Sequence, residues 1–94
     1  MRTRDQELSD FLYGGPYPEG YPTGYERVLA RKLQMMKAAR ELRDLKSPPG
    51  NRLELLQGDL KGHWSIRVSK QWRLVFIWDA VNKEATDVYF DDYH

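Results

Sequence analysis

Two arginines and the last three residues of the chain are the side chains best suited to chemistry on an anion. Arg67 and Arg73 flank a short connection between two strand-like runs, which would place them opposite each other across a hairpin. Two such guanidiniums repel each other unless an anion lies between them, and arginine is suited to bidentate contact with phosphate. The chain closes on Asp92, Tyr93 and His94, which add a carboxylate, a phenol and an imidazole that exchanges a proton near neutral pH.

Each of these groups also has a purely structural interpretation. Arg67 or Arg73 could form an ion pair with Asp87 or Asp91. The terminal residues could be a solvated tail, because chain ends fray unless something holds them. However, the run 86–91 before the tail is rich in β-branched and aromatic residues, which is typical of a strand. A strand there would hold the tail at the edge of a rigid sheet.

Positive charge is concentrated in the middle of the chain. Residues 1–26 carry two basic and five acidic side chains, a net of −3. Residues 27–73 carry twelve basic and four acidic side chains, a net of +8. Residues 74–94 carry one basic and five acidic side chains, a net of −4. A segment this cationic is typical of proteins that bind a polyanion such as nucleic acid; the alternative is a solvated helix face. Four further side chains widen the positive area around the two arginines: Arg52, Lys61, His63 and Lys70.

The hydrophobic pattern predicts helices in the first half of the chain. A short helix is expected over residues 5–13, followed by a loop over residues 14–24 that is rich in Gly, Pro and Tyr. The tyrosines of this loop could cap the core or a binding surface. An amphipathic helix is expected over residues 26–45, because apolar residues recur there at helical spacing, and the Ser-Pro-Pro-Gly run at 47–50 ends it.

The second half of the chain has the period of two that predicts strands, over residues 53–56, 64–68, 72–78 and 86–91. Consecutive strands with short connections pair antiparallel. The predicted fold class is therefore α+β, with N-terminal helices packed on a small antiparallel β-sheet. The 94 residues leave room for one core, so we expect a single domain over residues 1–94.

Composition argues against several kinds of site. The chain has no cysteine and two distant histidines, and it lacks a Gly-rich phosphate loop and a Ser-His-Asp order. We therefore expect no metal and no cofactor. The N-terminus lacks the apolar region of a secretory signal, and no apolar run approaches the length that spans a bilayer. These features predict a cytoplasmic protein without a membrane partner.

Several short motifs, taken together, carry a resemblance to a known family. They are Pro48-Pro49-Gly50-Asn51-Arg52-Leu53-Glu54, Gly58-Asp59, Trp64-Ser65-Ile66-Arg67-Val68, Gln71-Trp72-Arg73-Leu74-Val75-Phe76 and Asp92-Tyr93-His94. With the helical segment 27–33, this set resembles the HigB-type toxins of the RelE/ParE superfamily of bacterial toxin–antitoxin modules. The resemblance covers about residues 26–94.

The resemblance implies a RelE-like microbial ribonuclease fold and a small cytoplasmic endoribonuclease, an mRNA interferase that usually acts on the translating ribosome. It also implies a HigA-like helix-turn-helix antitoxin, with operator DNA bound only through the toxin–antitoxin complex. By position, Arg73 would contact the scissile phosphate and Arg67 would support it. Tyr93 and His94 would supply acid–base or orienting groups, with Asp92 beside them. The expected RNA-binding surface comprises Arg52, Glu54, Gln57, Lys61, His63 and Lys70.

The implied reaction is attack of a ribose 2′-hydroxyl on the adjacent phosphate. It needs a base, stabilisation of the phosphorane charge and an acid for the leaving 5′-oxygen. The arginine pair can stabilise the charge, and His94 or Tyr93 could act as base or acid. Glu54 is a further candidate base if its carboxylate faces the arginines.

The chain departs from the family pattern at a few positions. Many members have a lysine where this chain has Gln57, and some have a histidine where it has Glu54. Gln57 favours one alternative, a catalytically weakened binding or regulatory partner of an antitoxin. A second alternative, a toxin that targets gyrase, is disfavoured by the terminal Asp-Tyr-His sequence. Relatives also open with a short strand, of which residues 1–4 are at best a stub.

Overall fold

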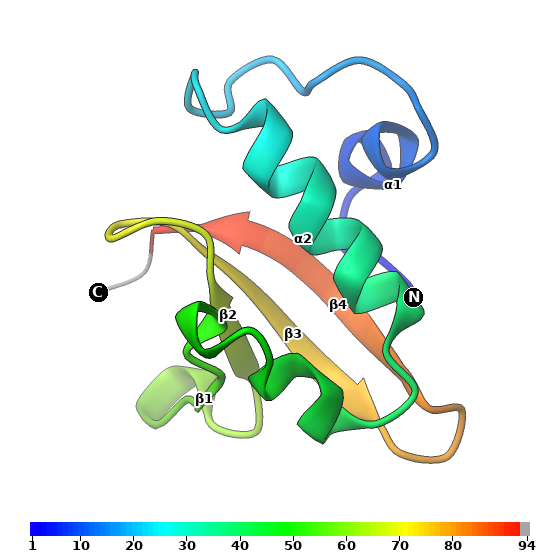
Figure 1. Cartoon of the computed structure of the whole chain (residues 1–94), viewed down its shortest axis with the longest axis vertical. Helices are drawn as coiled ribbons and strands as arrows, with labels where there is room; N and C mark the ends of the chain where they lie inside the picture. The colour runs from blue at the N-terminus through cyan, green and yellow to red at the C-terminus, as the bar shows by residue number, and fades with distance from the viewer. Residues whose placement is uncertain (93–94) are drawn as a thin grey trace.

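A four-stranded antiparallel sheet, in the order β1-β2-β3-β4, forms the centre of the molecule (Figure 1). The computed structural model describes residues 1–92. Its strands are β1 (Glu54–Leu55), β2 (Trp64–Arg67), β3 (Arg73–Asp79) and β4 (Glu84–Asp91). Its helices are α1 (Gln6–Leu12) and α2 (Glu26–Ala38), with 3-10 turns η1 (Leu42–Lys46), η2 (Pro49–Asn51) and η3 (Gly58–Leu60). The α+β prediction is confirmed.

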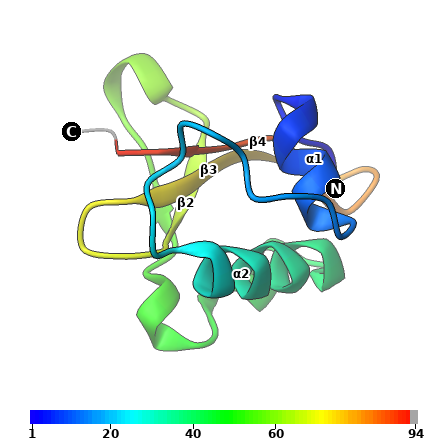
Figure 2. The same cartoon turned by 90° about the horizontal axis from the view of Figure 1, so that it is seen from above.

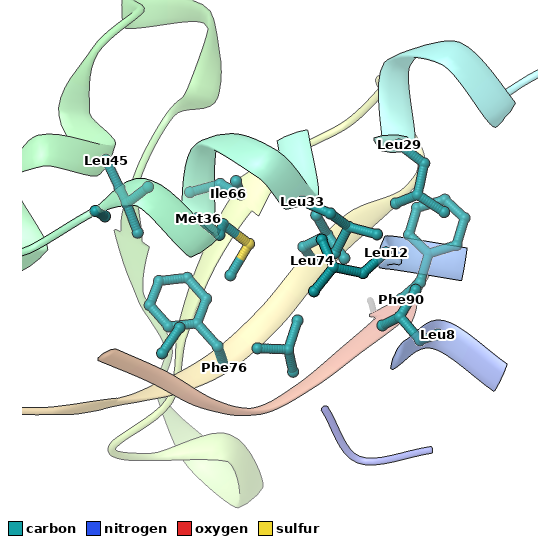
Figure 3. Close-up of a cluster of buried hydrophobic side chains, with 13 residues drawn as sticks. Leu8, Leu12, Leu29, Leu33, Met36, Leu45, Ile66, Leu74, Phe76 and Phe90 are labelled. Carbon is teal, nitrogen blue, oxygen red and sulfur yellow. The ribbon is translucent and has the colours of Figure 1, made fainter. Parts of the chain in front are cut away.

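The helix α2 covers one face of the sheet, and the segment around η3 rises on the opposite side (Figure 2). Apolar side chains of α2 meet those of β2, β3 and β4 in the core, and α1 closes its edge (Figure 3). Fully or nearly fully buried members of this core include Leu8, Leu12, Leu29, Leu33, Met36, Ile66, Leu74, Phe76, Val88 and Phe90. The alternation predicted for the strands thus orients one side of the sheet toward α2.

The N-terminal segment lies along the outer edge of β4. Thr3 forms a parallel bridge with Val88, and the amides of Arg2 and Arg4 donate to the carbonyls of Ala85 and Val88 at 3.0 and 2.8 Å. The stub expected at residues 1–4 is therefore an isolated bridge, and it protects part of an edge that would otherwise be open to pairing with another chain.

The tyrosines of the 14–24 loop cap the core. Tyr17 lies edge-on between Phe11 and Tyr21, with ring centroids 5.4 and 5.8 Å away, and Tyr21 continues to Phe90 of β4 at 5.5 Å. The Tyr17 hydroxyl also donates to the carbonyl of Pro22 at 2.5 Å. These contacts settle the question that the sequence left open for this loop, because they use the aromatic rings for packing.

The prediction of one helix over residues 26–45 is wrong at its C-terminal end. The helix α2 ends at Ala38, Ala39 is extended, and the chain resumes as η1. The carboxylate of Asp44 accepts hydrogen bonds from the backbone amides of Arg40 and Glu41, both at 3.0 Å, and these bonds lower the pKa of Asp44. Those amides would otherwise donate within a continuing helix, so the local carboxylate competes with the helix and starts a new turn.

Within residues 1–92, no helix is both long and apolar enough to cross a membrane.

Candidate nucleic-acid interface

The face of the sheet that points away from α2 carries the polar side chains. Because Ile66, Leu74, Phe76 and Phe90 point into the core, their strand neighbours point to the other side. We call this the far face and define it by Ser65, Arg67, Arg73, Val75, Tyr89 and Asp91. Val75 is fully buried there, so the far face has an apolar centre with charged groups around it.

The two arginines predicted to be neighbours are direct cross-strand partners. Arg67 of β2 is opposite Arg73 of β3, and Arg73 is opposite Asp91 of β4, so one row of charged residues crosses three strands. Arg67 donates from Nε to the carbonyl of Ser69 at 3.1 Å. Both arginines are half-buried, which strengthens their interaction with an anion relative to fully solvated side chains.

The guanidinium of Arg73 is oriented by two hydrogen bonds. Its Nε donates to the Oγ of Ser65 at 2.8 Å, and its Nη2 donates to the carbonyl of Arg52 at 2.7 Å. Arg52 has a left-handed backbone (φ 45°) at the end of η2, a conformation that is uncommon for a residue with a side chain. A guanidinium held in this way, with further N–H donors beyond Nε and Nη2, is pre-organised for a ligand anion.

A buried polar cluster fixes the turn that carries Arg52. Asn51 is fully buried, and its amide nitrogen donates to the carbonyls of Leu45 and Ser47 at 3.1 and 3.2 Å. Its Oδ1 accepts a hydrogen bond from Nζ of Lys32, which is only 7% exposed. Burial lowers the pKa of Lys32. The cluster thereby ties α2, η1 and η2 together directly beneath Arg52.

The carboxylates proposed as structural partners of the arginines have other contacts. Asp87 binds Arg4 through two hydrogen bonds, at 2.9 and 2.8 Å, and these bonds hold the pKa of Asp87 below its usual range. Asp91 accepts from the backbone amide of Asp92 at 2.9 Å. The Asp92 carboxylate accepts from the side-chain amide of Gln71 at the β2–β3 hairpin, at 3.0 Å.

The remaining predicted RNA-binding residues occupy different positions. Glu54 lies opposite Ser65 across β1 and β2 and is exposed; Gln57 precedes η3 and Lys61 follows it, both exposed. Lys70 is exposed in the β2–β3 hairpin. Tyr93 and His94 lie outside the described residues.

His63 differs from the others because its imidazole is only 19% exposed. Its Nε2 lies 3.9 Å from the Asp87 carboxylate, and its Nδ1 is buried without a hydrogen-bond partner among residues 1–92. This position favours a role in linking the η3 segment to β4 over direct contact with RNA.

Sequence reasoning missed two elements of the site: the Ser65 hydroxyl and the Arg52 carbonyl. Ser65 is fully buried in β2 between Trp64 and Ile66, and the register places it diagonally across from Arg73. In the sequence, the hydrogen bond from Arg73 to Ser65 could have been indicated by a small polar residue on the same sheet face as an arginine of the next strand. The Arg52 carbonyl gave no signal in the sequence, because its direction depends on a backbone angle.

Within the described part of the chain, no group of three or more His, Cys, Asp or Glu side chains is placed to hold a metal ion.

Comparison with known proteins identifies similar chains. The family model described as a RelE-like toxin of the type II toxin–antitoxin system HigB matches residues 2–94. Toxin HigB-1 of Vibrio cholerae serotype O1 is 42% identical over 91 residues, which cover 97% of this chain and 94% of that protein. Endoribonuclease HigB of Proteus vulgaris is 35% identical over 63 residues, 67% of this chain and 65% of that protein. In fold, the chain resembles a chain of the toxin–antitoxin complex RelBE2 from Mycobacterium tuberculosis (TM-score 0.50, 19% identity, 98% and 96% coverage).

Proposed function

The chain belongs to the HigB-like family of RelE-like toxins of type II toxin–antitoxin systems, and from this premise we propose that it is an endoribonuclease that cleaves messenger RNA on the translating ribosome. The observation that carries the proposal is the Arg67–Arg73 pair on the far face, with Arg73 held by Ser65 and Arg52. The relative from Proteus vulgaris is named an endoribonuclease, which supports the same activity.

In the proposed reaction, the ribose 2′-hydroxyl attacks the adjacent phosphorus and the 5′-oxygen leaves. Arg73 contacts the non-bridging oxygens of the phosphate, and Arg67 adds positive charge beside it, so both stabilise the phosphorane. His94 and Tyr93 supply the base and the acid, with Asp92 as an orienting neighbour and Glu54 as a further candidate base. A tyrosine has an ordinary pKa of about 10, so Tyr93 needs the nearby cations in order to act as a base.

The RNA strand would run across the far face. Three exposed cations would provide phosphate contacts along the strand: Arg52 beside Arg73, Lys61 after η3 and Lys70 in the β2–β3 hairpin. Gln57 precedes η3, whose segment lies on the side of the sheet opposite α2 (Figure 2), and it offers a neutral amide. We assign His63 a structural role through Asp87.

The proposed partners follow from the family and the charge distribution. A HigA-like helix-turn-helix antitoxin neutralises the toxin, operator DNA is bound only through their complex, and messenger RNA and the ribosome are the targets. The toxin acts in the cytoplasm as one domain over residues 1–94.

Induced expression in a bacterial host tests the proposal, with growth arrest and messenger RNA cleavage as readouts. We expect wild type to arrest growth and Arg73→Ala to lower cleavage by about 100-fold or more, because a charge-stabilising donor is lost. His94→Ala should also lower it. Arg31→Ala is the matched control: Arg31 is exposed on α2, the helix that packs on the opposite face of the sheet, and its loss should leave cleavage unchanged. Arrest that neither Arg73→Ala nor His94→Ala relieves would contradict the site assignment, and a DNA-damage response without messenger cleavage would indicate a gyrase toxin.

Gln57 favours a second candidate, a weakened family member that serves as a binding partner of its antitoxin. Under that alternative, wild type does not cleave messenger RNA and Gln57→Lys restores cleavage, because it adds a cation next to η3.

A further inference from the structure

The guanidinium of Arg4, outside the predicted site, is fixed in both position and plane. Its Cζ lies 3.7 Å from the centroid of the Tyr89 ring. Its Nε and Nη2 donate to the two carboxylate oxygens of Asp87 at 2.9 and 2.8 Å. A bidentate carboxylate sets the plane of the guanidinium, and the ring supports one of its faces.

A backbone irregularity orients the Asp87 carboxylate. The register between β3 and β4 shifts between Val75 and Ile77, and Asp87 at this bulge has a left-handed backbone (φ 52°). Bulges are enriched beside functional sites because they re-aim a side chain. Here the re-aimed carboxylate is the group that holds Arg4 over Tyr89.

The Arg4–Tyr89 stack lies next to the proposed phosphate position. Tyr89 belongs to the far face and is two residues from Asp91, the cross-strand partner of Arg73. Two residues along a strand span about 7 Å, a distance that neighbouring nucleotides of a single strand can cover. The Arg4 side chain is 49% exposed, so a large part of it remains open to a ligand.

The charge of Arg4 is already paired with Asp87, which makes this arginine a poor phosphate ligand. Its planar surface is the feature that remains available. Proteins that read single-stranded RNA stack bases on aromatic rings and on arginine planes, and such stacking tolerates any base.

We propose that Arg4, supported by Tyr89 and oriented by Asp87, is a stacking platform for the nucleobase next to the phosphate that Arg73 binds. This inference rests on the proposed function, since it places RNA on the far face. A purely structural alternative is that Arg4 only clamps the N-terminal segment to β4.

The test measures affinity for two hexamers at low salt: 2′-O-methyl oligoadenylate, which cannot undergo 2′-hydroxyl attack, and the same backbone without bases. We expect Arg4→Ala to weaken binding of the oligoadenylate by about tenfold and to leave binding of the abasic chain unchanged. Arg4→Lys keeps the charge next to Asp87 and should therefore fold, yet it lacks the plane and should show a similar loss. Arg2→Ala is the matched control, because Arg2 lies in the same segment and its charge acts on Asp79.

The possible outcomes distinguish failure of the stacking platform from failure of the proposed function. Arg73→Ala should lower the affinity for both hexamers to the same extent. If Arg73→Ala changes neither affinity, or if wild type binds neither hexamer, RNA does not occupy the far face and both proposals fail. If Arg73→Ala lowers both affinities and the Arg4 variants lose no base-dependent affinity, only the stacking platform is overturned. The alternative, that Arg4 clamps the N-terminal segment to β4, is then supported if urea denaturation shows the Arg4 variants to be destabilised.

Discussion

At the scale of single residues, Arg73 is held in position before a ligand arrives. Ser65 and the carbonyl of Arg52 fix its guanidinium from two sides, and Arg67 is its direct cross-strand partner. Because Arg73 is already ordered in the free protein, binding does not cost the side-chain entropy that ordering a free arginine would. The two arginines also repel each other in the free protein, and a bound phosphate relieves the repulsion.

The Arg4–Asp87 pair predicts a specific pH dependence of stability. The hydrogen bonds from Arg4 lower the pKa of Asp87 in the folded state, against an opposing effect of desolvation. A carboxyl group with a lowered folded pKa stabilises the fold above its unfolded pKa of about 3.9 and loses this contribution as pH falls through the folded value. Asp87→Asn should therefore destabilise the protein near neutral pH by about 1 kcal/mol or less, since Asp87 is 35% exposed, and the deficit should disappear in acid.

Urea denaturation of wild type and Asp87→Asn from pH 2.5 to 7.5 measures this difference. As a control, the same comparison in an Arg4→Ala background should show a smaller pH dependence, because the main donor is absent and only His63 still lowers the pKa of Asp87. If the difference in the free energy of unfolding between wild type and Asp87→Asn stays constant down to the lowest pH, the charge of Asp87 is not its source.

At the scale of elements, the hydrophobic pattern predicts α1, the start of α2 and the order of the strands, since these depend on local periodicity. It does not predict the end of α2 at Ala38, because the break comes from a carboxylate that captures two backbone amides. The arginine pair is predictable from strand spacing alone. The bulge at Asp87 and the left-handed Arg52 are not, because both depend on how separate segments meet.

The buried cluster at Asn51 gives a prediction for the elements that it joins. Asn51→Ala removes the bonds to Leu45 and Ser47 and leaves the Lys32 ammonium buried without its partner. We expect a loss of about 2–4 kcal/mol in the free energy of unfolding, measured by urea denaturation.

Two control variants define the source of that loss. Gly50→Ala, next to Asn51 at an exposed position with open space around its Cα, should stay within about 0.5 kcal/mol of wild type. Adding Lys32→Met to Asn51→Ala should recover part of the stability, because the unpaired buried charge is gone. An Asn51→Ala protein as stable as wild type would mean that the cluster does not hold α2 to η2.

At the scale of the whole molecule, the two faces of the sheet have different roles. Its α2 side forms the apolar core, and its far face collects the arginine row and the platform of Arg4. The family, the α+β class and the arginine pair could be inferred from the sequence because motifs and alternation carry them. The hydrogen bond from Arg73 to the Arg52 carbonyl could not, since it depends on a left-handed backbone in a separate segment.

The most direct measurement of the central claim is a single-turnover cleavage assay with purified protein on ribosomes programmed with end-labelled messenger RNA. We predict products with 2′,3′-cyclic phosphate and 5′-hydroxyl ends, as attack by the 2′-hydroxyl requires, and a rate for Arg73→Ala that is about 100-fold to 1,000-fold lower, with Arg31→Ala unchanged. Cleavage by Arg73→Ala at the wild-type rate would contradict a phosphodiester site built on the Arg67–Arg73 pair, and products that carry 5′-phosphate ends would contradict attack by the 2′-hydroxyl.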